Sequence, residues 1–377
     1  MDRRSFLFGT AMLASQLLTG CGNDKPTLSG TVLKGSIPNQ IVNQFQKVQP
    51  TVHLDFAPVA QLLDIYKLLQ TWQQKTPPKN QQWSFPRIPL PFIKSPPATA
   101  TEVVTLGDYW LQSAIEQKLI QPLDSGKLSS WSNLPPRWQE LVTRNDQGLL
   151  DKSGKVWAAP YRWGSTMIVY NRDKFRDLGW QPSDWSDLWR PELHSRLSLI
   201  AEAREVIGLT LKKLGKSYNT ENLDIPNLAS ELRALNRQVK FYSSTNYLEP
   251  LVIGDTWLAV GWSNDILPIL SRYPYLTAII PKSGTALWAD MWVNPVRQGS
   301  KTLSQQWIDF CWQPHIAKEI SILTKSNSPI DIKLTAADYP EQLRLLANNA
   351  EVFAKSEFLL PFPTAVTQKY ESLFKTL

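Results

Sequence analysis

The chain has 377 residues, enough for two domains of ordinary size, each with its own hydrophobic core. Hydrophobic residues make up 42% and charged residues 19%, which excludes a disordered chain, and no apolar run is long enough to span a bilayer. The net charge of +7 comes from dispersed lysines and arginines, so it indicates a solvated surface and no nucleic-acid partner.

The first residues carry an export signal. Residues 3–7 are Arg-Arg-Ser-Phe-Leu, a twin-arginine (Tat) pattern, and an apolar region of signal-peptide length follows. Residues 18–21 are Leu-Thr-Gly-Cys, which resembles a lipobox, where the chain is cut before the cysteine and its thiol is lipidated. We predict a signal peptide over 1–20, a lipid anchor at Cys21 and a tether over 21–27. The protein would be a membrane-anchored lipoprotein of the periplasm, with no transmembrane helix needed.

After the tether, short β-rich runs alternate with amphipathic stretches. Strands are predicted at 31–33 and 52–56, and helices at 38–48 and 60–72. This order favours a mostly parallel sheet with helices on its faces. The stretch 73–100 then carries seven prolines, so it is predicted to be an extended surface insertion, either an arm that contacts a partner or, as we favour, a solvated loop.

The same alternation continues beyond the insertion and predicts an α/β fold. The predicted strands are 102–106, 166–170, 197–200, 257–260 and 276–280, and the predicted helices are 109–118, 205–214, 303–323 with an interruption at Pro314, and 365–374. Cys311 lies in the apolar pattern of the third of these helices. Because Cys21 would be lipidated, Cys311 has no disulfide partner and is predicted to be a core residue.

Candidate binding side chains follow two of these strands. Trp262 and Ser263 close the run 257–260, while Trp288 and Asp290 follow the turn after the run 276–280. In open α/β sheets ligands bind beyond the carboxyl ends of strands, so we expect both pairs at a ligand site. Two indoles and a carboxylate would suit a cation. The chain contains 16 tryptophans, which fits either a ligand-binding protein or a tryptophan-rich core.

Two acidic residues mark the start of a predicted helix. Glu202 and Glu205 stand three residues apart in a first helical turn that follows a strand. The helix dipole favours ionised carboxylates there, so a cationic ligand would meet two negative charges. Acidic residues at this position also serve simply to complement the dipole, and the residues alone leave both interpretations open.

The sequence shows no clear motif for a catalytic site or a metal site. Residues 261–265 approach a nucleophile elbow but lack its closing glycine. The three histidines are more than 100 residues apart, which signals neither a triad base nor a zinc cluster. A ferric-ion binder would need adjacent tyrosines, but Tyr273 and Tyr275 alternate with a proline, so their rings are expected on opposite faces. We predict no enzyme, no metal and no cofactor.

The order of these stretches resembles that of periplasmic polyamine-binding (spermidine/putrescine) proteins, which belong to the family 1 extracellular solute-binding proteins of ABC transporters. The resemblance covers most of 102–325. It rests on Tyr109, on the strand-end Trp262 and on four stretches: Pro-Tyr-Arg-Trp-Gly at 160–164, Trp-Ser-Asp-Leu-Trp at 185–189, Glu-Ala-Arg-Glu-Val at 202–206 and Trp-Ala-Asp at 288–290. It implies two α/β lobes with a ligand cleft between them. The lobes would be 28–163 with 289–330, which includes the proline-rich insertion, and 164–288 with 331–377.

The resemblance also implies a ligand set, in which carboxylates hold the amines and aromatic faces contact the methylenes. The predicted ligand-binding residues are Asp108, Tyr109, Glu202, Glu205, Trp262, Trp288 and Asp290. Two positions differ from the family: Asp108 adds a third candidate acid, and Lys34 with Gly35 replaces a Trp-Thr pair. A lysine inside the cleft would repel a polyamine. Either Lys34 points outward, or the ligand is shorter, or it carries an anionic group.

These observations predict a monomeric substrate-binding lipoprotein of an ABC importer. It would capture a small cationic solute, a polyamine such as spermidine or putrescine, by closing the cleft, and deliver it to a membrane permease without a chemical step. Three alternatives stay open. These are a binding protein for ferric ion or an amino-acid-like ligand, an envelope lipoprotein that senses a ligand without transport, and an envelope hydrolase, whose nucleophile and base the sequence does not signal.

Overall fold

The structure is a computed structural model that describes residues 26–73, 100–296, 301–332, 335–338, 344 and 350–377. The predicted signal peptide, the predicted lipidation site Cys21 and nearly all of the proline-rich insertion lie outside these residues. Within the described ranges, every helix falls short of the length and apolar character that crossing a membrane requires.

Helices and strands alternate along the chain, as the sequence pattern predicts. The strands are β1 (Thr27–Leu33), β2 (His53–Val59), β3 (Val103–Gly107), β4 (Ile120–Gln121), β5 (Thr143–Arg144), β6 (Lys155–Val156), β7 (Ala159–Asn171), β8 (Leu197–Leu199), β9 (Val239–Tyr242), β10 (Leu258–Trp262), β11 (Leu276–Ile279), β12 (Ala286–Pro295) and β13 (Glu357–Phe358). The α-helices are α1 (Asn39–Val48), α2 (Leu62–Gln73), α3 (Asp108–Glu116), α4 (Pro136–Val142), α5 (Arg172–Leu178), α6 (Ala203–Lys213), α7 (Leu228–Asn236), α8 (Glu249–Val252), α9 (Ser263–Arg272), α10 (Lys301–Cys311), α11 (Pro314–Thr324), α12 (Ala350–Lys355) and α13 (Thr364–Phe374). Short 3₁₀ helices are η1 (Ser125–Lys127), η2 (Trp131–Asn133), η3 (Trp185–Trp189), η4 (Pro191–Leu193) and η5 (Ala336–Asp338).

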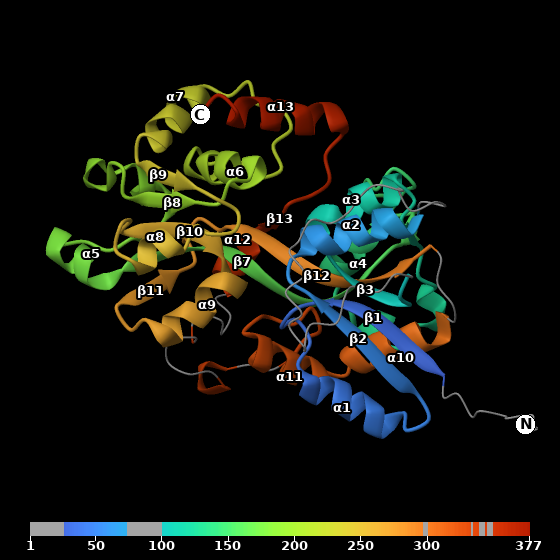
Figure 1. Cartoon of the computed structure of the whole chain (residues 1–377). Coiled ribbons are helices and arrows are strands. Elements are labelled where there is room, and N and C mark those ends of the chain that lie inside the picture. The colour runs from blue at the N-terminus through green and yellow to red at the C-terminus, as the bar shows by residue number, and fades with distance from the viewer. Residues whose placement is uncertain (1–25, 74–99, 297–300, 333–334, 339–343, 345–349) are drawn as a thin grey trace, which may run out of the picture.

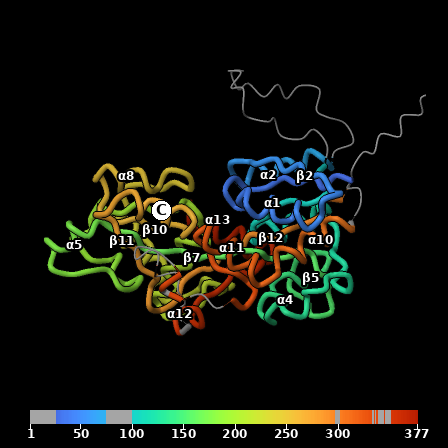
Figure 2. Tube along the Cα trace, turned by 90° about the horizontal axis from the view of Figure 1, so that it is seen from below, coloured from blue at the N-terminus to red at the C-terminus, as the bar shows by residue number. Residues whose placement is uncertain are grey.

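Two long antiparallel strands, β7 and β12, connect the two halves of one sheet. The strand order is β2-β1-β3-β12-β7-β10-β8-β9, with β11 also paired to β7. The first half of β7 pairs with β12, and its second half pairs with β10 and β11. In Figure 1 both strands run between a lobe that carries α1 to α4 and a lobe that carries α5 to α9, and Figure 2 shows the same two bodies from below. The fold is therefore two-lobed α/β, as predicted.

Each lobe has its own hydrophobic core. The first core takes its buried residues from 28–163 and 287–330, together with Phe358. In the second lobe the two faces of β7 serve different cores, because side chains alternate along a strand. Ile168 and Tyr170 pack towards α6 and α7, whereas Met167 and Val169 pack towards α9.

The C-terminal segment connects the lobes a third time, and it corrects one predicted boundary. The sequence placed all of 331–377 in the second lobe, but Phe353 and Phe358 pack on the first core. The chain changes lobe after β13, which pairs with the start of β12. Phe362 and Tyr370 then join the core of the second lobe. The boundary was misplaced because these two short apolar segments have no periodicity that would assign them to either lobe.

Most predicted elements are confirmed, including the break of the 303–323 helix at Pro314, where α11 begins. Cys311 is buried and free, as expected of a core residue. The sequence did not predict the full length of the crossing strands, 13 residues for β7 and 10 for β12. The tryptophan content serves mainly the core, since Trp185, Trp292, Trp307 and Trp312 are among the largest fully buried side chains.

Candidate functional site

The candidate site is organised around one stretch of β7, where the strand passes from one lobe to the other. Alternate residues of a strand share a face. The side chains of Arg162 and Thr166 therefore lie on one side of β7, and Gly164 leaves space on that same side. Their direct partners on the neighbouring antiparallel strands are Asp290 and Trp288 on β12 and Trp262 on β10. The register of the sheet thus gathers three of the predicted ligand-binding residues on one face.

Asp290 is paired with an arginine of its own chain. The Oδ2 atom of Asp290 lies 2.6 Å from Nη2 and 2.8 Å from Nε of Arg162. Both residues are buried, with 2% and 4% of their surface exposed. Burial raises the pKa of Asp290, and Arg162 opposes that rise. The predicted amine-binding carboxylate is therefore already neutralised in this structure.

The sequence analysis included Arg162 in a motif but assigned it no role. A signal was available, because Arg162 is the only charged residue between Lys155 and Arg172. A lone charge in a long apolar strand needs a buried partner, since an unpaired buried charge is strongly unfavourable. The partner could not be identified from the sequence, because Asp290 lies 128 residues further along the chain.

Glu205, in the first turn of α6, is the most deeply buried acid that the second lobe contributes. One carboxylate oxygen accepts hydrogen bonds from the Thr166 hydroxyl at 2.9 Å and from the Trp262 indole at 3.1 Å. The other, Oε2, is buried and has no hydrogen-bond partner among the described residues. Burial raises the pKa of Glu205 to about 7, although the bonds from Thr166 and Trp262 lower it. A buried acceptor without a partner calls for a donor.

Glu202 and Tyr109 are two predicted site residues that belong to different lobes. Glu202 precedes α6, is half-buried, and accepts a hydrogen bond from the Ser244 hydroxyl at 2.8 Å. Tyr109 lies in α3 of the first lobe and is 48% exposed. Burial is the largest cause that raises the pKa of Tyr109, and the negative charge of Glu202 is the second. Glu202 of the second lobe and Tyr109 of the first are therefore close enough for the charge of one to act on the other.

Asp108 occupies a structural position. It begins α3, and its Oδ1 accepts a hydrogen bond from the backbone N–H of Ala289 at 3.2 Å. Burial raises the pKa of Asp108 to about 7; Arg144 lowers it and Asp290 raises it further. The contact fixes the start of α3 against β12, next to Trp288 and Asp290.

Trp288 packs its indole against the backbone of β7. A Cβ atom added at Gly164 would lie 2.6 Å from Cε2 of Trp288 and closer still to the Ser263 hydroxyl, so only glycine fits there. The guanidinium carbon of Arg162 lies 5.7 Å from the centre of the Trp288 ring, within cation–π range. The indole N–H of Trp288 is buried and has no acceptor in the part of the chain that the structure describes.

The structure also decides how Lys34 and the pair Tyr273 and Tyr275 are oriented. Lys34 is exposed, which agrees with the outward orientation that the sequence left open. The expectation that Tyr273 and Tyr275 face opposite ways is wrong, because their ring centres lie 5.9 Å apart. Side chains two positions apart along an extended chain share a face, so alternation should have placed both rings on one side. The Tyr275 hydroxyl donates to the backbone oxygen of Val252 at 2.8 Å.

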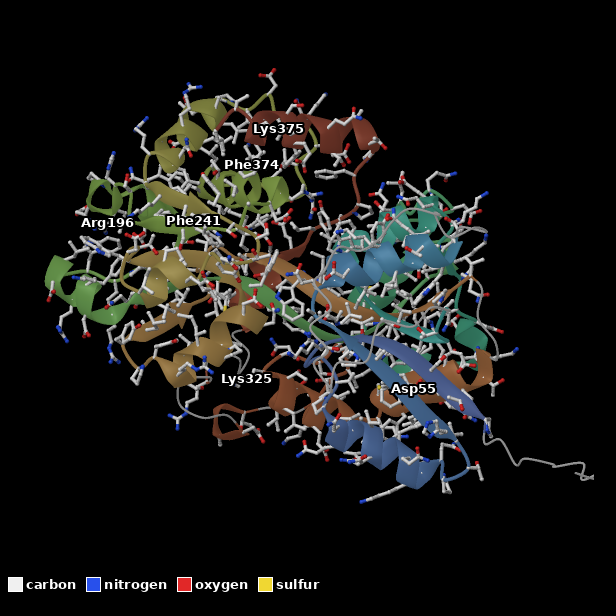
Figure 3. All side chains as sticks on the ribbon, in the orientation of Figure 1. Asp55, Arg196, Phe241, Lys325, Phe374 and Lys375 are labelled. Carbon is white, nitrogen blue, oxygen red and sulfur yellow. The ribbon has the colours of Figure 1, made fainter. Side chains whose placement is uncertain are left out.

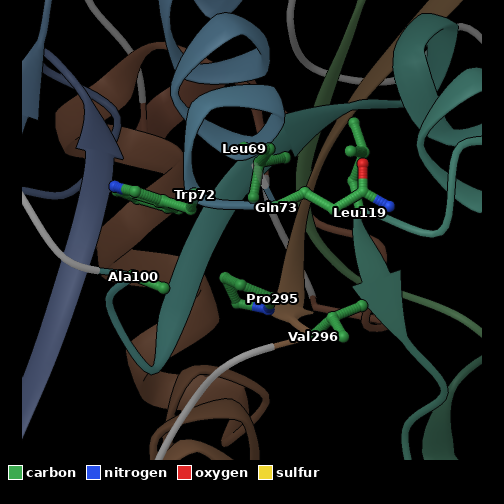
Figure 4. A pocket seen from close by; sticks show the side chains of 7 residues that line it. All are labelled: Leu69, Trp72, Gln73, Ala100, Leu119, Pro295 and Val296. Carbon is green, nitrogen blue, oxygen red and sulfur yellow. The ribbon is translucent and has the colours of Figure 1, made fainter. Parts of the chain in front are cut away.

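The sequence analysis expected Trp288 and Asp290 beyond the end of a strand. In the structure both residues lie inside β12. Trp262, by contrast, is the last residue of β10, as predicted. Two surface cavities lie elsewhere. One of about 10 Å³ is lined by residues around Trp72 and Pro295 (Figure 4), and one of about 560 Å³ borders Trp157. Neither includes a predicted site residue.

Two side chains of the second lobe pack on the C-terminal segment of the chain. Phe374 of α13, labelled in Figure 3, packs edge to face on Tyr242 with ring centres 5.7 Å apart. Arg204 follows Ala203 in the first turn of α6, but its guanidinium lies 3.6 Å from the centre of the Phe362 ring and donates to the backbone oxygen of Leu360. Arg204 therefore holds the C-terminal segment, while Glu202 and Glu205 remain at the site.

Comparison with known proteins gives the site a context. A sequence model of the family described as "Bacterial extracellular solute-binding protein" matches residues 101–355. A spermidine/putrescine-binding periplasmic protein of Salmonella typhimurium is 29% identical over 223 residues, 59% of this chain and 61% of the relative. A putrescine-binding periplasmic protein of Escherichia coli is 28% identical over 240 residues, 59% of this chain and 63% of the relative. The matches thus span less than two thirds of these curated relatives.

The fold has solved counterparts over nearly its whole length. A spermidine/putrescine ABC transporter substrate-binding protein from Streptococcus pneumoniae superposes with a TM-score of 0.75, at 20% sequence identity, over 93% of this chain and 98% of that one. At this identity the likeness concerns the fold alone.

Proposed function

Because the chain belongs to the bacterial extracellular solute-binding proteins, we propose that it is the substrate-binding component of an ABC importer and captures a small amine cation between its lobes. The observation that carries this proposal is the buried carboxylate of Glu205, one oxygen of which lacks a partner among the described residues. An ammonium group supplies the missing donor and the compensating charge. The names of the relatives point to spermidine and putrescine as the first ligands to test.

The proposed binding mode uses both lobes. Glu202 and Glu205 hold the ammonium from the second lobe, and the Trp262 ring contacts the ligand beside them. Tyr109 closes from the first lobe, and Trp288 covers the ligand from β12. Each aromatic face contributes roughly 0.5–2 kcal/mol of cation–π attraction. Asp108 and Asp290 line the same region and shape its charge.

Closure of the cleft would follow because the ligand contacts residues of both lobes. We propose that the two cores rotate about β7, β12 and the segment that follows β13, because these are the connections between the lobes. A ligand that contacts residues of both lobes stabilises the closed form by its differential affinity for it. The closed form is then what a permease recognises, and no chemical step is required.

Anchoring at the membrane is a separate part of the proposal. The sequence supports export by the twin-arginine route and lipidation at Cys21. A lipid-anchored, monomeric binding protein would stay close to its permease in the periplasm, where the named relatives are located.

The proposal can be tested by thermal unfolding of the purified protein with Cys21→Ser, which removes the proposed lipidation site. The panel contains spermidine, putrescine, amino acids, sugars and ferric citrate. A ligand at about a thousand times its dissociation constant should stabilise the fold by roughly 4 kcal/mol. We expect amines to raise the Tm of this protein and to leave a Glu205→Gln variant unchanged. If no amine in the panel shifts the Tm, an amine-binding function is excluded.

A further inference from the structure

One end of the site does not suit a second ammonium group. Both Arg162 contacts fall on one oxygen of Asp290, and both residues are buried. An ammonium brought to Asp290 would also approach the guanidinium and be repelled. It could take over the carboxylate only by leaving a buried arginine without its counter-ion, which is strongly unfavourable.

The indole N–H of Trp288 needs a hydrogen-bond acceptor from the ligand. Its N–H is buried without an acceptor within the described ranges, and an indole nitrogen can only donate. A protonated polyamine carries donors and no acceptor, so it cannot satisfy this group. A ligand oxygen could.

The start of helix α9 lies at the same end of the site. The helix α9 starts at Ser263, whose hydroxyl accepts a hydrogen bond from the Ser165 backbone N–H at 3.2 Å and would abut any side chain at Gly164. The Trp288 ring lies against the same glycine. Asp265 stands in the first turn of α9 and accepts a hydrogen bond from the Tyr247 hydroxyl, so the donors for a ligand oxygen at this end are Arg162 and the Trp288 N–H.

The opposite end of the site is negative and close by. The partnerless oxygen belongs to Glu205, whose other oxygen is held by Thr166. Thr166 and Gly164 are two residues apart on β7, a separation of about 7 Å along the strand. The site thus offers an acceptor for an ammonium and, a few ångströms away, donors for an oxygen.

We propose that the preferred ligand is a short zwitterionic amine, in which a carboxylate replaces the second ammonium of a diamine. Its ammonium lies against Glu205 and Glu202, and its carboxylate accepts from Arg162 and the Trp288 N–H. Arg162 is then the residue that determines specificity, because it neutralises Asp290 and attracts the ligand oxygen. This inference rests on the proposed function, since it needs an amine site between the lobes.

Two probes of equal length separate the possibilities. Putrescine has four carbons and two ammonium groups, and 4-aminobutyrate has four carbons, one ammonium and one carboxylate. By isothermal titration calorimetry at pH 8 we expect 4-aminobutyrate to bind at least about tenfold more tightly, the effect of one charge-assisted hydrogen bond. A preference for putrescine would overturn the inference and leave the proposed function intact. If neither probe binds and no amine in the wider panel does, the proposed function itself fails.

Variants test which residues cause the preference for 4-aminobutyrate. The measured quantity is the ratio of the affinities for the two probes, because a general loss of binding lowers both affinities and leaves their ratio unchanged. Arg162→Met should lower the affinity for 4-aminobutyrate about tenfold or more and reduce its advantage over putrescine, while Arg162→Lys keeps the charge and should retain part of that advantage. Trp288→Phe keeps one aromatic ring and removes the N–H together with the five-membered ring that carries it, so it tests the same point if Arg162→Met does not fold. An unchanged ratio in the variants that fold would place the carboxylate elsewhere and refute the inference.

Discussion

Replacing Glu205 by glutamine should separate the stability of this protein from its ability to bind an amine. In the folded chain the pKa of Glu205 is raised from its ordinary value of 4.5 to about 7, chiefly by burial. The folded state therefore binds a proton more tightly than the unfolded state, and this contribution to stability is fully present below pH 4.5 and is lost as the pH rises to about 7. At about 1.4 kcal/mol for each pKa unit, the loss amounts to roughly 3 kcal/mol.

Glutamine imitates the protonated acid at every pH. Its side-chain oxygen can still accept from Thr166 and Trp262, as the Glu205 oxygen does. The difference in unfolding free energy between Glu205→Gln and the parent protein should therefore move by roughly 3 kcal/mol in favour of the variant between pH 5 and pH 8. This corresponds to a change of about 10 °C in relative Tm for lobes of this size. The measurement is a Tm series against pH for both proteins without ligand.

A matched control is Glu192→Gln, because Glu192 is exposed and such substitutions change stability by less than about 0.5 kcal/mol. Parallel curves of Tm against pH for Glu205→Gln and the parent would refute the reasoning, since they would mean that Glu205 does not titrate near neutral pH. Amine affinity should also rise between pH 6 and pH 8, because an ammonium prefers the ionised carboxylate. A ligand-induced Tm shift that survives in Glu205→Gln would exclude Glu205 as the amine contact.

Three further outcomes follow from the same structure. Arg162→Met should destabilise the fold by about 3–5 kcal/mol at pH 8, because it leaves the buried Asp290 carboxylate without its counter-ion, and adding Asp290→Asn should restore most of the loss in denaturant unfolding. Gly164→Ala should cost about 1–3 kcal/mol and weaken ligand binding, because the new methyl group displaces the Trp288 ring; full binding in calorimetry would contradict this packing. Cys21→Ser should release the exported protein from the membrane fraction, and retention there on immunoblots would count against the lipid anchor.

The periodicity of the sequence predicted the helices and strands that surround the site, because local patterns of apolar residues decide which face of an element is buried. It therefore gave the strand that ends at Trp262 and the helix start at Glu202 and Glu205. It did not predict that Trp288 and Asp290 lie inside a long strand. A crossing strand is defined by its partners on both sides, and those pairings are formed between segments far apart in the chain.

The same limit applies to the C-terminal segment. Its last helix was predicted, but its first part was assigned to the wrong lobe, because Phe353 and Phe358 belong to short elements whose burial depends on which surface they meet. Pairing of β13 with β12 decides that surface.

The sequence by itself determined the α/β class, and its resemblance to a known family indicated the two lobes and suggested the carboxylates and aromatic rings of the candidate site. Only the tertiary structure decided how those groups are used. The pairing of Asp290 with Arg162, the two hydrogen bonds to Glu205 and the close packing of Trp288 on Gly164 all depend on the register of β7 with its neighbours. A shift of that register by one residue would turn every one of these side chains to the other face of the sheet, and no local pattern specifies it across such separations.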